Sequence, residues 1–431
     1  MVSGKSSYYD SSEIEDAVFD LLDEAKTDEA CELAETGVKL HPGDETLEKL
    51  LCWIYLHTQQ VDKAEQIFAR YEHDGTESTV KLKFCFEVIN GHPQSALSNF
   101  FQYLESKGIK SLDWVTTIDE MFDAIPHEVL IPHLEKAANL IQDNAEALGR
   151  VGAMLMDCKQ FLPAVHVLEK SLDMDAYDIF SWQDLSRCYF ELNDLEKCAE
   201  SCDYGLAIDP ENPMLNFTRG YLHYNNNEWA DAVRTMEVAR RFAEGRLHND
   251  NINLTEDEIQ ANTTITYHIL GTSYAALGKV DEAIECFEIL MERNPNNEEF
   301  LMELSTLLLD EGDLPKTLAL AERGLQHSPK NTNILALKAS VLTSMQRYTE
   351  ALEILQQLHK IKPKSKNYLL AIAELANAIH RYETADNAFR SLLELRPKDK
   401  NTRDRLWEYF ASIGDDDALR RVEGLNGNRD A

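Results

Sequence analysis

The chain has 431 residues, and its length, composition and charge exclude several architectures and partners. A single hydrophobic core stops growing at about 250–300 residues, so the chain must form several domains or an array of repeats. Asp and Glu outnumber Lys and Arg by 76 to 42, which gives a formal net charge of −34 and disfavours nucleic acid and anionic membranes as partners. A basic protein remains open as a partner.

The N-terminal residues are polar and acidic. Residues 1–16 lack the apolar stretch of a signal peptide, and the sequence contains no run of about 18 apolar residues that could span a membrane. We therefore expect a cytoplasmic protein whose residues 1–10 form a flexible N-terminus.

The sequence repeats with a period of 34 residues, which four prolines mark. Four prolines, Pro295, Pro329, Pro363 and Pro397, are each 34 residues apart. Extending this period along the chain gives eleven repeats over residues 11–399, which begin at Ser11, Glu45, Glu77, Ser111, Ala145, Ile179, Pro213, Thr264, Glu298, Thr332 and Lys366. Most intervals are 34 residues. The interval from Glu45 to Glu77 is 32 residues, and the interval from Pro213 to Thr264 is 51 residues, 17 more than the period.

Each repeat is predicted to form a helical hairpin. Apolar residues recur at spacings of three and four in both halves of a repeat, and breakers such as Asn193-Asp194 separate the halves. Small residues would let the two helices of a hairpin approach closely. These residues are Gly152, Gly220 and Gly271 in first helices and Ala164, Ala232 and Ala283 in second helices.

The repeat that begins at Ser111 departs from this pattern. Leu130 stands where the other repeats have a small residue. Pro132 falls where the interior of a helix is expected, so we predict a kink or a late helix start there.

The residues within the period resemble the tetratricopeptide pattern. One repeat reads Tyr267-x2-Leu270-Gly271-x2-Tyr274, then Ala283-x3-Phe287 and Pro295. The resemblance covers roughly residues 11–414 and implies an all-α fold, a right-handed α-solenoid superhelix of helix–turn–helix repeats. The chain is also similar to the long cytoplasmic tetratricopeptide proteins common in bacteria.

The resemblance implies that first helices line a concave groove where ligands lie. At about 100° per residue, the second, fifth, ninth and twelfth residues of a repeat form this face. The residues that we expect to bind a partner are Met156, Phe180, Arg187, Phe190, Met214, Phe217, Tyr221 and Tyr224. Exposed aromatic residues beside an arginine are typical of binding hot spots. The alternative is that a tight superhelix packs these side chains against neighbouring first helices.

The extra residues form an insertion at about residues 243–263. Thr255-x-x-Glu258 resembles a capping box, so we expect the next first helix to start early and to be longer by at least two turns. Residues 245–254 would form a polar loop. The insertion would either protrude as a second contact surface or fold over the groove.

The C-terminal residues are predicted to close the array. Residues 400–414 mix charged and apolar side chains, which suits a capping helix. Residues 415–431 are polar and rich in Gly and Asp, and we expect them to form a frayed tail.

The sequence offers no catalytic signature. Gly4-Lys5-Ser6 lacks the earlier glycine of a phosphate-binding loop. Cys198 and Cys202 would share a helix face, but no His or Cys pair at suitable spacing joins them to form a metal site. Nearly every residue belongs to the repeat, so we predict no catalytic residue, no cofactor and no metal.

We therefore expect a non-catalytic protein–protein interaction scaffold or adaptor that binds a peptide or helix in the concave groove. The main alternative is a homo-oligomeric structural protein, such as a homodimer, that uses the aromatic stripe or the insertion as a self-interface. An enzyme or an enzyme's regulatory chain and an RNA-binding helical repeat are weaker alternatives. An enzyme needs a pocket of convergent polar groups, and an RNA-binding repeat needs a basic groove.

Overall fold

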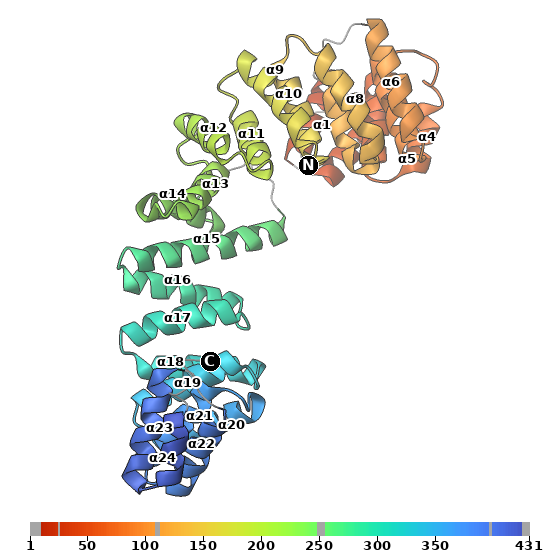
Figure 1. The fold of residues 1–431 in the computed structure, drawn as a ribbon. Helices are drawn as coiled ribbons and strands as arrows, with labels where there is room; N and C mark the ends of the chain where they lie inside the picture. Colours follow the sequence, from red (N-terminus) through yellow and green to blue (C-terminus); the bar gives the residue numbers. More distant parts are fainter. Residues whose placement is uncertain (1–9, 25, 108–112, 248–254, 396–398, 425–431) are drawn as a thin grey trace, which may run out of the picture. The chain divides into compact units, whose positions relative to one another are not determined.

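The computed structural model describes residues 10–24, 26–107, 113–247, 255–395 and 399–424. These residues form 24 α-helices and one short 3-10 helix, and consecutive helices pack as pairs (Figure 1). The contacts divide the chain into an N-terminal unit, Met1–Thr218, and a C-terminal unit, Arg219–Ala431. Each unit is a stack of helical hairpins, so the all-α repeat fold is confirmed. One continuous superhelix over residues 11–399 stays a prediction.

The N-terminal unit holds the first six hairpins. Its helices are α1 (Ser11–Asp23), α2 (Thr27–Leu40), α3 (Glu45–His57), α4 (Val61–Phe68), α5 (Glu77–Ile89), α6 (Pro93–Lys107), α7 (Asp113–Glu120), η1 (Phe122–Ala124), α8 (His127–Leu140), α9 (Ala145–Asp157), α10 (Phe161–Met174), α11 (Ile179–Glu191) and α12 (Leu195–Ile208). The division between the two units falls inside α13 (Pro213–Asn225).

The C-terminal unit continues with the same pairing. Its helices are α14 (Trp229–Ala243), α15 (Glu256–Ala276), α16 (Val280–Arg293), α17 (Glu298–Asp310), α18 (Leu314–His327), α19 (Thr332–Ser344), α20 (Tyr348–Ile361), α21 (Lys366–Ala378), α22 (Tyr382–Glu394), α23 (Lys400–Ile413) and α24 (Asp416–Gly424). Within the described residues, no helix combines the length and the apolar character that crossing a membrane requires.

Odd-numbered helices are the first helices of the hairpins, and local capping sets where they begin. Asp44 accepts hydrogen bonds from the backbone N–H groups of Thr46 and Leu47, at 3.1 and 3.2 Å, and thereby starts α3. Asn144, Asp178, Asn297 and Asn331 cap α9, α11, α17 and α19 in the same way. A side-chain acceptor satisfies N–H groups that have no partner within the helix, which explains why these helices begin at the predicted residues.

The turn inside most of the described hairpins has one geometry. In ten of these hairpins the residue that precedes the second helix by two positions has a positive φ. It is a glycine in four of them, Gly91, Gly278, Gly312 and Gly414. In the others it is Gln59, Lys159, Asn193, Asn227, Gln346 or His380, with φ between 58° and 61°. One left-handed residue therefore ends each of these first helices and reverses the chain.

The two helices of a hairpin cross at the predicted small residues. A Cβ atom at Gly152 would lie 2.6 Å from Leu168, and one at Gly271 would lie 2.8 Å from the ring of Phe287. Ala164 and Ala283 are fully buried in the facing helices. A larger residue at either glycine would overlap a side chain of the facing helix, which agrees with the predicted role of these small residues.

Neighbouring hairpins are joined by a recurring tyrosine contact. Tyr55 donates a hydrogen bond to Glu35 of the preceding second helix at 2.7 Å, and Lys63 lies 4.8 Å from the centre of the Tyr55 ring. The same arrangement recurs with Tyr189, Glu169 and Lys197 and with Tyr274, Glu237 and Lys279. This contact uses the tyrosine of the repeat pattern to fix one hairpin against the next.

The insertion lengthens α15. Thr255 and Glu258 form a capping box, in which the Thr255 hydroxyl accepts from the Glu258 N–H and the Glu258 carboxylate accepts from the Thr255 N–H. The helix consequently begins at Glu256, more than two turns before Thr264, as predicted. Most of the predicted loop, residues 248–254, lies outside the described residues.

Two local predictions have different outcomes. Helix α8 begins at His127 and continues through Pro132, so its start is not late, and the alternative of a kink at Pro132 stays a prediction. Residues 416–424 do not fray but form α24, because the spacing of Ala418 and Val422 buries both side chains and Asp415 accepts a hydrogen bond from the Ala418 N–H. Residues 1–9 and 425–431, the ends of the predicted flexible segments, lie outside the described residues.

Candidate functional site

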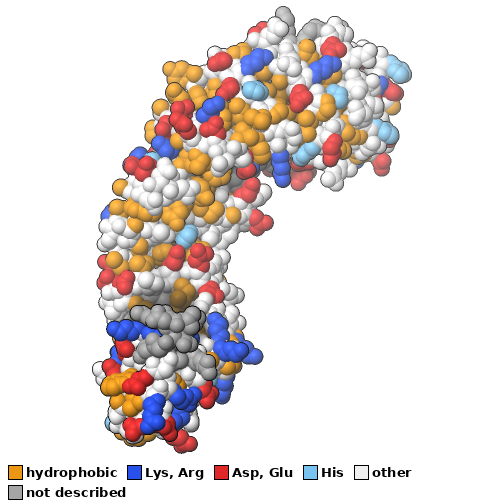
Figure 2. Space-filling view, in the orientation of Figure 1, with side chains coloured by type: hydrophobic (Ala, Val, Ile, Leu, Met, Phe, Trp, Pro, Cys, Tyr) orange, Lys and Arg blue, Asp and Glu red, His pale blue; other side chains and the backbone are white. Residues whose placement is uncertain are grey.

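The candidate binding surface lies on the first helices α7, α9 and α11 of the N-terminal unit. Asp178 caps α11 by accepting from the Phe180 N–H at 3.1 Å, which places Phe180 in the first turn of the helix. Phe180, Arg187 and Phe190 then follow at spacings of seven and three residues, so the helical period aligns them on one side of α11. All three side chains are exposed, Phe180 by 45% and Phe190 by 36%. In Figure 2, hydrophobic side chains of this unit lie at its surface among charged ones.

The other predicted residues lie in different environments. Met156 is only 5% exposed, so it has almost no surface to offer a partner. Met214 and Phe217 of α13 are half-buried in the N-terminal unit. Tyr221 and Tyr224 are half-buried and belong to the C-terminal unit, where Tyr224 meets Trp229 edge to face at 5.8 Å. A stripe that joins all eight residues stays a prediction.

Carboxylates surround Arg187 on this surface, and the sequence analysis missed them. Burial raises the pKa of Asp184 to about 7, the charges of Asp157 and Asp178 add to this effect, and Arg187 opposes it. Burial likewise raises the pKa of Asp157, which Arg187 again opposes. The carboxylates thus outnumber the arginine, and part of their negative charge is suppressed in the free protein.

The acidic character extends to α7. Asp119 has a raised pKa, caused first by burial, and its carboxylate lies 3.8 Å from the Arg150 guanidinium. Arg150 also pairs with Glu146 at 3.4 Å. We use the name "α11 face" for Asp119, Asp157, Phe180, Asp184, Arg187 and Phe190. The period could have located Asp119, because it occupies the ninth position of its repeat, as Arg187 does.

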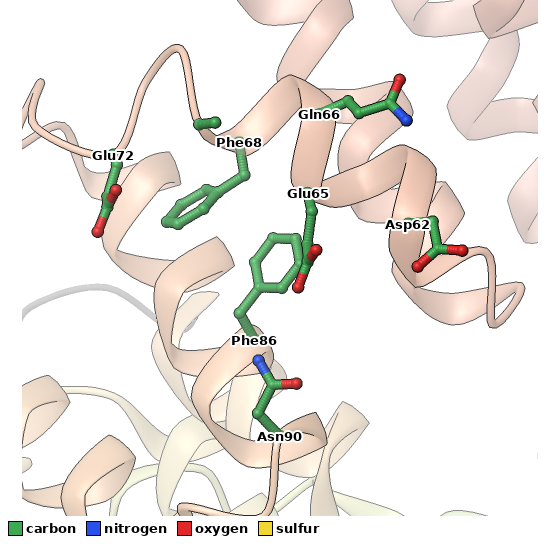
Figure 3. Close-up of a pocket in the computed structure, with 8 residues that line it drawn as sticks. Asp62, Glu65, Gln66, Phe68, Glu72, Phe86 and Asn90 are labelled. Atoms are coloured by element: carbon green, nitrogen blue, oxygen red, sulfur yellow. The ribbon is translucent and has the colours of Figure 1, made fainter.

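A second acidic surface lies at α4 and α5. An open pocket of about 730 Å³ contains the rings of Phe68 and Phe86, whose centres are 4.7 Å apart. Figure 3 shows these rings facing one another beside carboxylates that α4 and the following turn contribute. The acidic lining residues are Asp62, Glu65 and Glu72. The pocket combines apolar and negative groups, as the α11 face does.

One group of side chains in the C-terminal unit has the composition of a metal site. His268 of α15 lies beside Glu299 and Glu303 of α17, and their ligand atoms are all within 4.8 Å of one another. No metal site was predicted from the sequence, where these three residues lie in two neighbouring repeats.

The family comparison identifies the repeats. Models of the tetratricopeptide repeat match residues 270–332 and residues 308–375. Residues 270–375 therefore contain tetratricopeptide repeats. Tetratricopeptide repeats generally bind proteins and are typically non-catalytic, and the matches identify no enzymatic domain in this chain. None of the curated proteins matches the chain.

Several solved structures of tetratricopeptide proteins are similar to parts of the chain. The structure of YrrB, described as a TPR protein with an unusual peptide-binding site, is 18% identical, covers 47% of this chain and 96% of its own, and has a TM-score of 0.38. PilF of Pseudomonas aeruginosa is 17% identical, covers 57% of this chain and 99% of its own, and has a TM-score of 0.34. A MamA structure is 15% identical, covers 44% of this chain and 94% of its own, and also has a TM-score of 0.34.

Proposed function

We propose that the protein is a non-catalytic scaffold that binds a peptide or helix of a partner protein on the α11 face. The observation that carries this proposal is the exposure of two phenylalanines on either side of Arg187 along one side of α11. Large aromatic side chains and arginine are the residue types that contribute most to binding energy in protein interfaces. Tetratricopeptide repeats, which the chain contains, generally serve protein binding.

The charges of this face favour a partner segment that carries both apolar and basic side chains. Phe180 and Phe190 offer apolar contact area. Asp157 and Asp184 have raised pKa values because of burial, and a cation from a partner would favour their ionised forms. The net charge of −34 would also accelerate the association of a basic partner.

The experiment removes the two phenylalanine rings. We expect a Phe180→Ala/Phe190→Ala variant to bind the partner at least about tenfold more weakly, because each ring removed from a hot spot costs about 1 kcal/mol or more. The partner would first be captured from native lysate with the wild-type chain, and its dissociation constant would then be measured with the purified proteins by calorimetry.

A matched control removes as much exposed apolar surface elsewhere in the same unit. Leu162 is 61% exposed on the second helix α10, and Tyr177 is 81% exposed before α11. The Leu162→Ala/Tyr177→Ala variant should bind as the wild type does. Equal affinity of all three proteins would show that the α11 face is not the binding site. Circular dichroism would verify that the variants keep their helices.

The wild type and the Phe180→Ala/Phe190→Ala variant can also be compared for self-association. If the wild-type chain shows a mass that increases with concentration in sedimentation experiments and the Phe180→Ala/Phe190→Ala variant does not, the α11 face is a homodimer interface instead. We further infer a cytoplasmic, bacterial-type tetratricopeptide scaffold, and the acidic composition and the length of the repeat array support this inference.

A further inference from the structure

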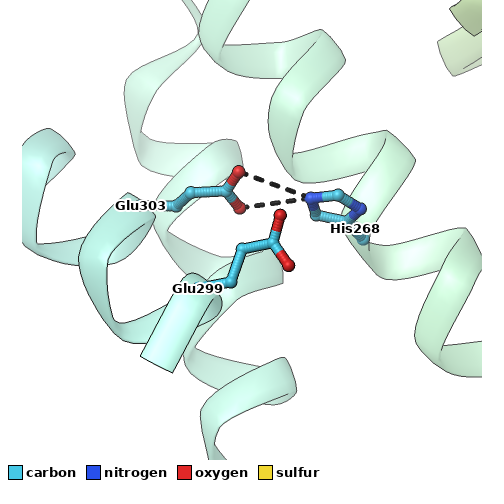
Figure 4. A group of neighbouring side chains, drawn as sticks. All are labelled: His268, Glu299 and Glu303. Atoms are coloured by element: carbon cyan, nitrogen blue, oxygen red, sulfur yellow. Dashed lines mark hydrogen bonds and ion pairs between the residues drawn. The ribbon is translucent and has the colours of Figure 1, made fainter. Parts of the chain in front are cut away.

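Two neighbouring first helices of the C-terminal unit bring an imidazole and two carboxylates together. His268 is the fifth residue of its repeat, and Glu299 and Glu303 are the second and sixth residues of the next. Figure 4 shows the three side chains directed toward one another from α15 and α17. The two glutamates are four residues apart, so the helical period places them on the same side of α17. The next junction in the unit has Met302 opposite Asn333 and Leu337 at the same positions, and these side chains could not form such a group.

The distances are close to those of a metal site. Nε2 of His268 lies 3.2 Å and 3.4 Å from the two carboxylate oxygens of Glu303. Ligands at about 2.0–2.2 Å from a tetrahedral zinc ion are about 3.3–3.5 Å apart. His268 and Glu303 already have this separation. Glu299 is exposed, and all ligand atoms lie within 4.8 Å of one another, so a change of its side-chain rotamer would bring it into range.

The negative charge of this group has no permanent counterion. Within the part of the chain that the structure describes, neither Glu299 nor Glu303 forms an ion pair with a lysine or arginine. Oε2 of Glu303 is shielded from solvent and lies 3.2 Å from Nε2 of His268. When His268 is neutral, the charges of both glutamates are unbalanced, and a cation bound between these residues would balance them.

The surrounding side chains hold the imidazole in place. The His268 ring lies 5.5 Å from the Phe300 ring and 6.3 Å from the Phe287 ring, measured between ring centres. Asn297 caps the start of α17 by accepting from the N–H groups of Glu299 and Phe300. The ligands therefore come from the first helices of two neighbouring hairpins, and a bound ion would not need to organise a loop.

We propose that His268, Glu299 and Glu303 bind one zinc ion, which ties α15 to α17. Imidazole nitrogen is a preferred ligand of zinc, whereas magnesium and calcium prefer oxygen ligands alone. Three protein ligands leave a further position for water. This site goes beyond the proposed scaffold function and does not depend on it, because the α11 face belongs to the other unit.

The test measures zinc binding by the full chain after treatment with a chelator. We expect the wild type to bind one zinc ion tightly enough to compete with a chromophoric chelator, and to gain thermal stability from it. His268→Ala and Glu303→Gln should each weaken this binding by about tenfold or more, as the loss of a metal-site residue does. Cobalt should give the wild type, but not the variants, a visible absorption band typical of a protein-bound ion.

Matched controls separate this site from weak binding to an acidic surface. His327→Ala removes an exposed histidine of α18, and Glu285→Gln removes an exposed carboxylate of α16. Both controls should retain the wild-type affinity and the thermal shift with zinc. If all five proteins bind zinc equally, or if the wild type shows neither a saturable site nor a thermal shift, the proposal is wrong. Glu303→Gln keeps the size of the side chain, so its result does not depend on a change in packing.

Discussion

At the scale of single residues, Asp184 of the α11 face has a carboxylate whose ionised form is disfavoured by its surroundings. Burial and the nearby charges of Asp157 and Asp178 raise its pKa to about 7, despite the opposing effect of Arg187. Ionisation of this carboxylate at neutral pH lowers the stability of the folded state, and an uncharged residue at this position would not have this effect. Perturbed carboxylates are more frequent at functional sites, which agrees with the proposed role of this face.

This pKa predicts how stability changes with pH. An Asp in the unfolded chain loses its proton near pH 4, whereas Asp184 in the folded chain keeps its proton up to about pH 7. The unfolded state therefore binds fewer protons between these pH values, and the contribution of Asp184 to stability falls as the pH rises through this range. We expect Asp184→Asn to increase the free energy of unfolding, by about 1–2 kcal/mol more at pH 8.5 than at pH 5.5.

The measurement is urea denaturation followed by circular dichroism at both pH values, which lie above the isoelectric point of about 4.7. Asp310→Asn, which replaces an exposed carboxylate at the end of α17, serves as the control. A gain for Asp184→Asn that is equal at both pH values would contradict the assignment of a raised pKa to this residue.

At the scale of elements, the turn within the hairpins explains how different sequences form one structure. The residue with positive φ needs no particular side chain, only tolerance of the left-handed region. Glycine has this tolerance, while Lys159 and Gln346 adopt the conformation at a steric disadvantage. The two helices that the turn joins determine its conformation even where the residue is unfavourable.

Exchanges at this position should therefore alter stability in opposite directions. Lys159→Gly should raise the free energy of unfolding by about 0.5–1 kcal/mol, because the left-handed region is unstrained for glycine. Gly278→Ala should lower it by about 1 kcal/mol. A Cβ at Gly278 would meet no atom within 4 Å, so the second effect comes from the backbone alone. Thermal unfolding of the two variants and the wild type measures both changes, and changes of the same sign would refute this explanation.

At the scale of the whole molecule, the excess of acidic residues is a property of the entire chain. The sequence has 76 acidic and 42 basic residues. The ion pairs of the described residues involve mainly exposed side chains, such as Arg347 with Glu350 at 2.7 Å, and exposed pairs contribute little. Repulsion among the remaining carboxylates opposes folding of the compact chain.

Salt should therefore stabilise this protein. Raising the NaCl concentration from about 20 to about 500 mM shortens the screening length from roughly 20 to roughly 4 Å and should raise the Tm by a few degrees near pH 8. Calorimetric scans at several salt concentrations would measure the effect. It should shrink at pH 5.5, nearer the isoelectric point of about 4.7. An equal salt effect at both pH values would point to a cause other than charge repulsion.

The sequence by itself determined the helical hairpins and their boundaries. The 34-residue period predicted where α3, α9 and α17 begin, because helix caps, left-handed turn residues and the Gly–Ala crossings act within one hairpin and recur with it. The capping box of Thr255 and Glu258 likewise predicted the early start of α15. These features are local, and local interactions leave a signature in the order of residues.

Only the tertiary structure decided what depends on how the hairpins stack. The period placed Met156 and Phe180 on the same predicted face, but packing buries Met156 and leaves Phe180 exposed. The raised pKa of Asp184 results from burial among groups of other helices, and His268 meets Glu303 only because α15 and α17 lie side by side. Burial and contacts between repeats depend on distances in space, and a one-dimensional pattern does not contain these distances.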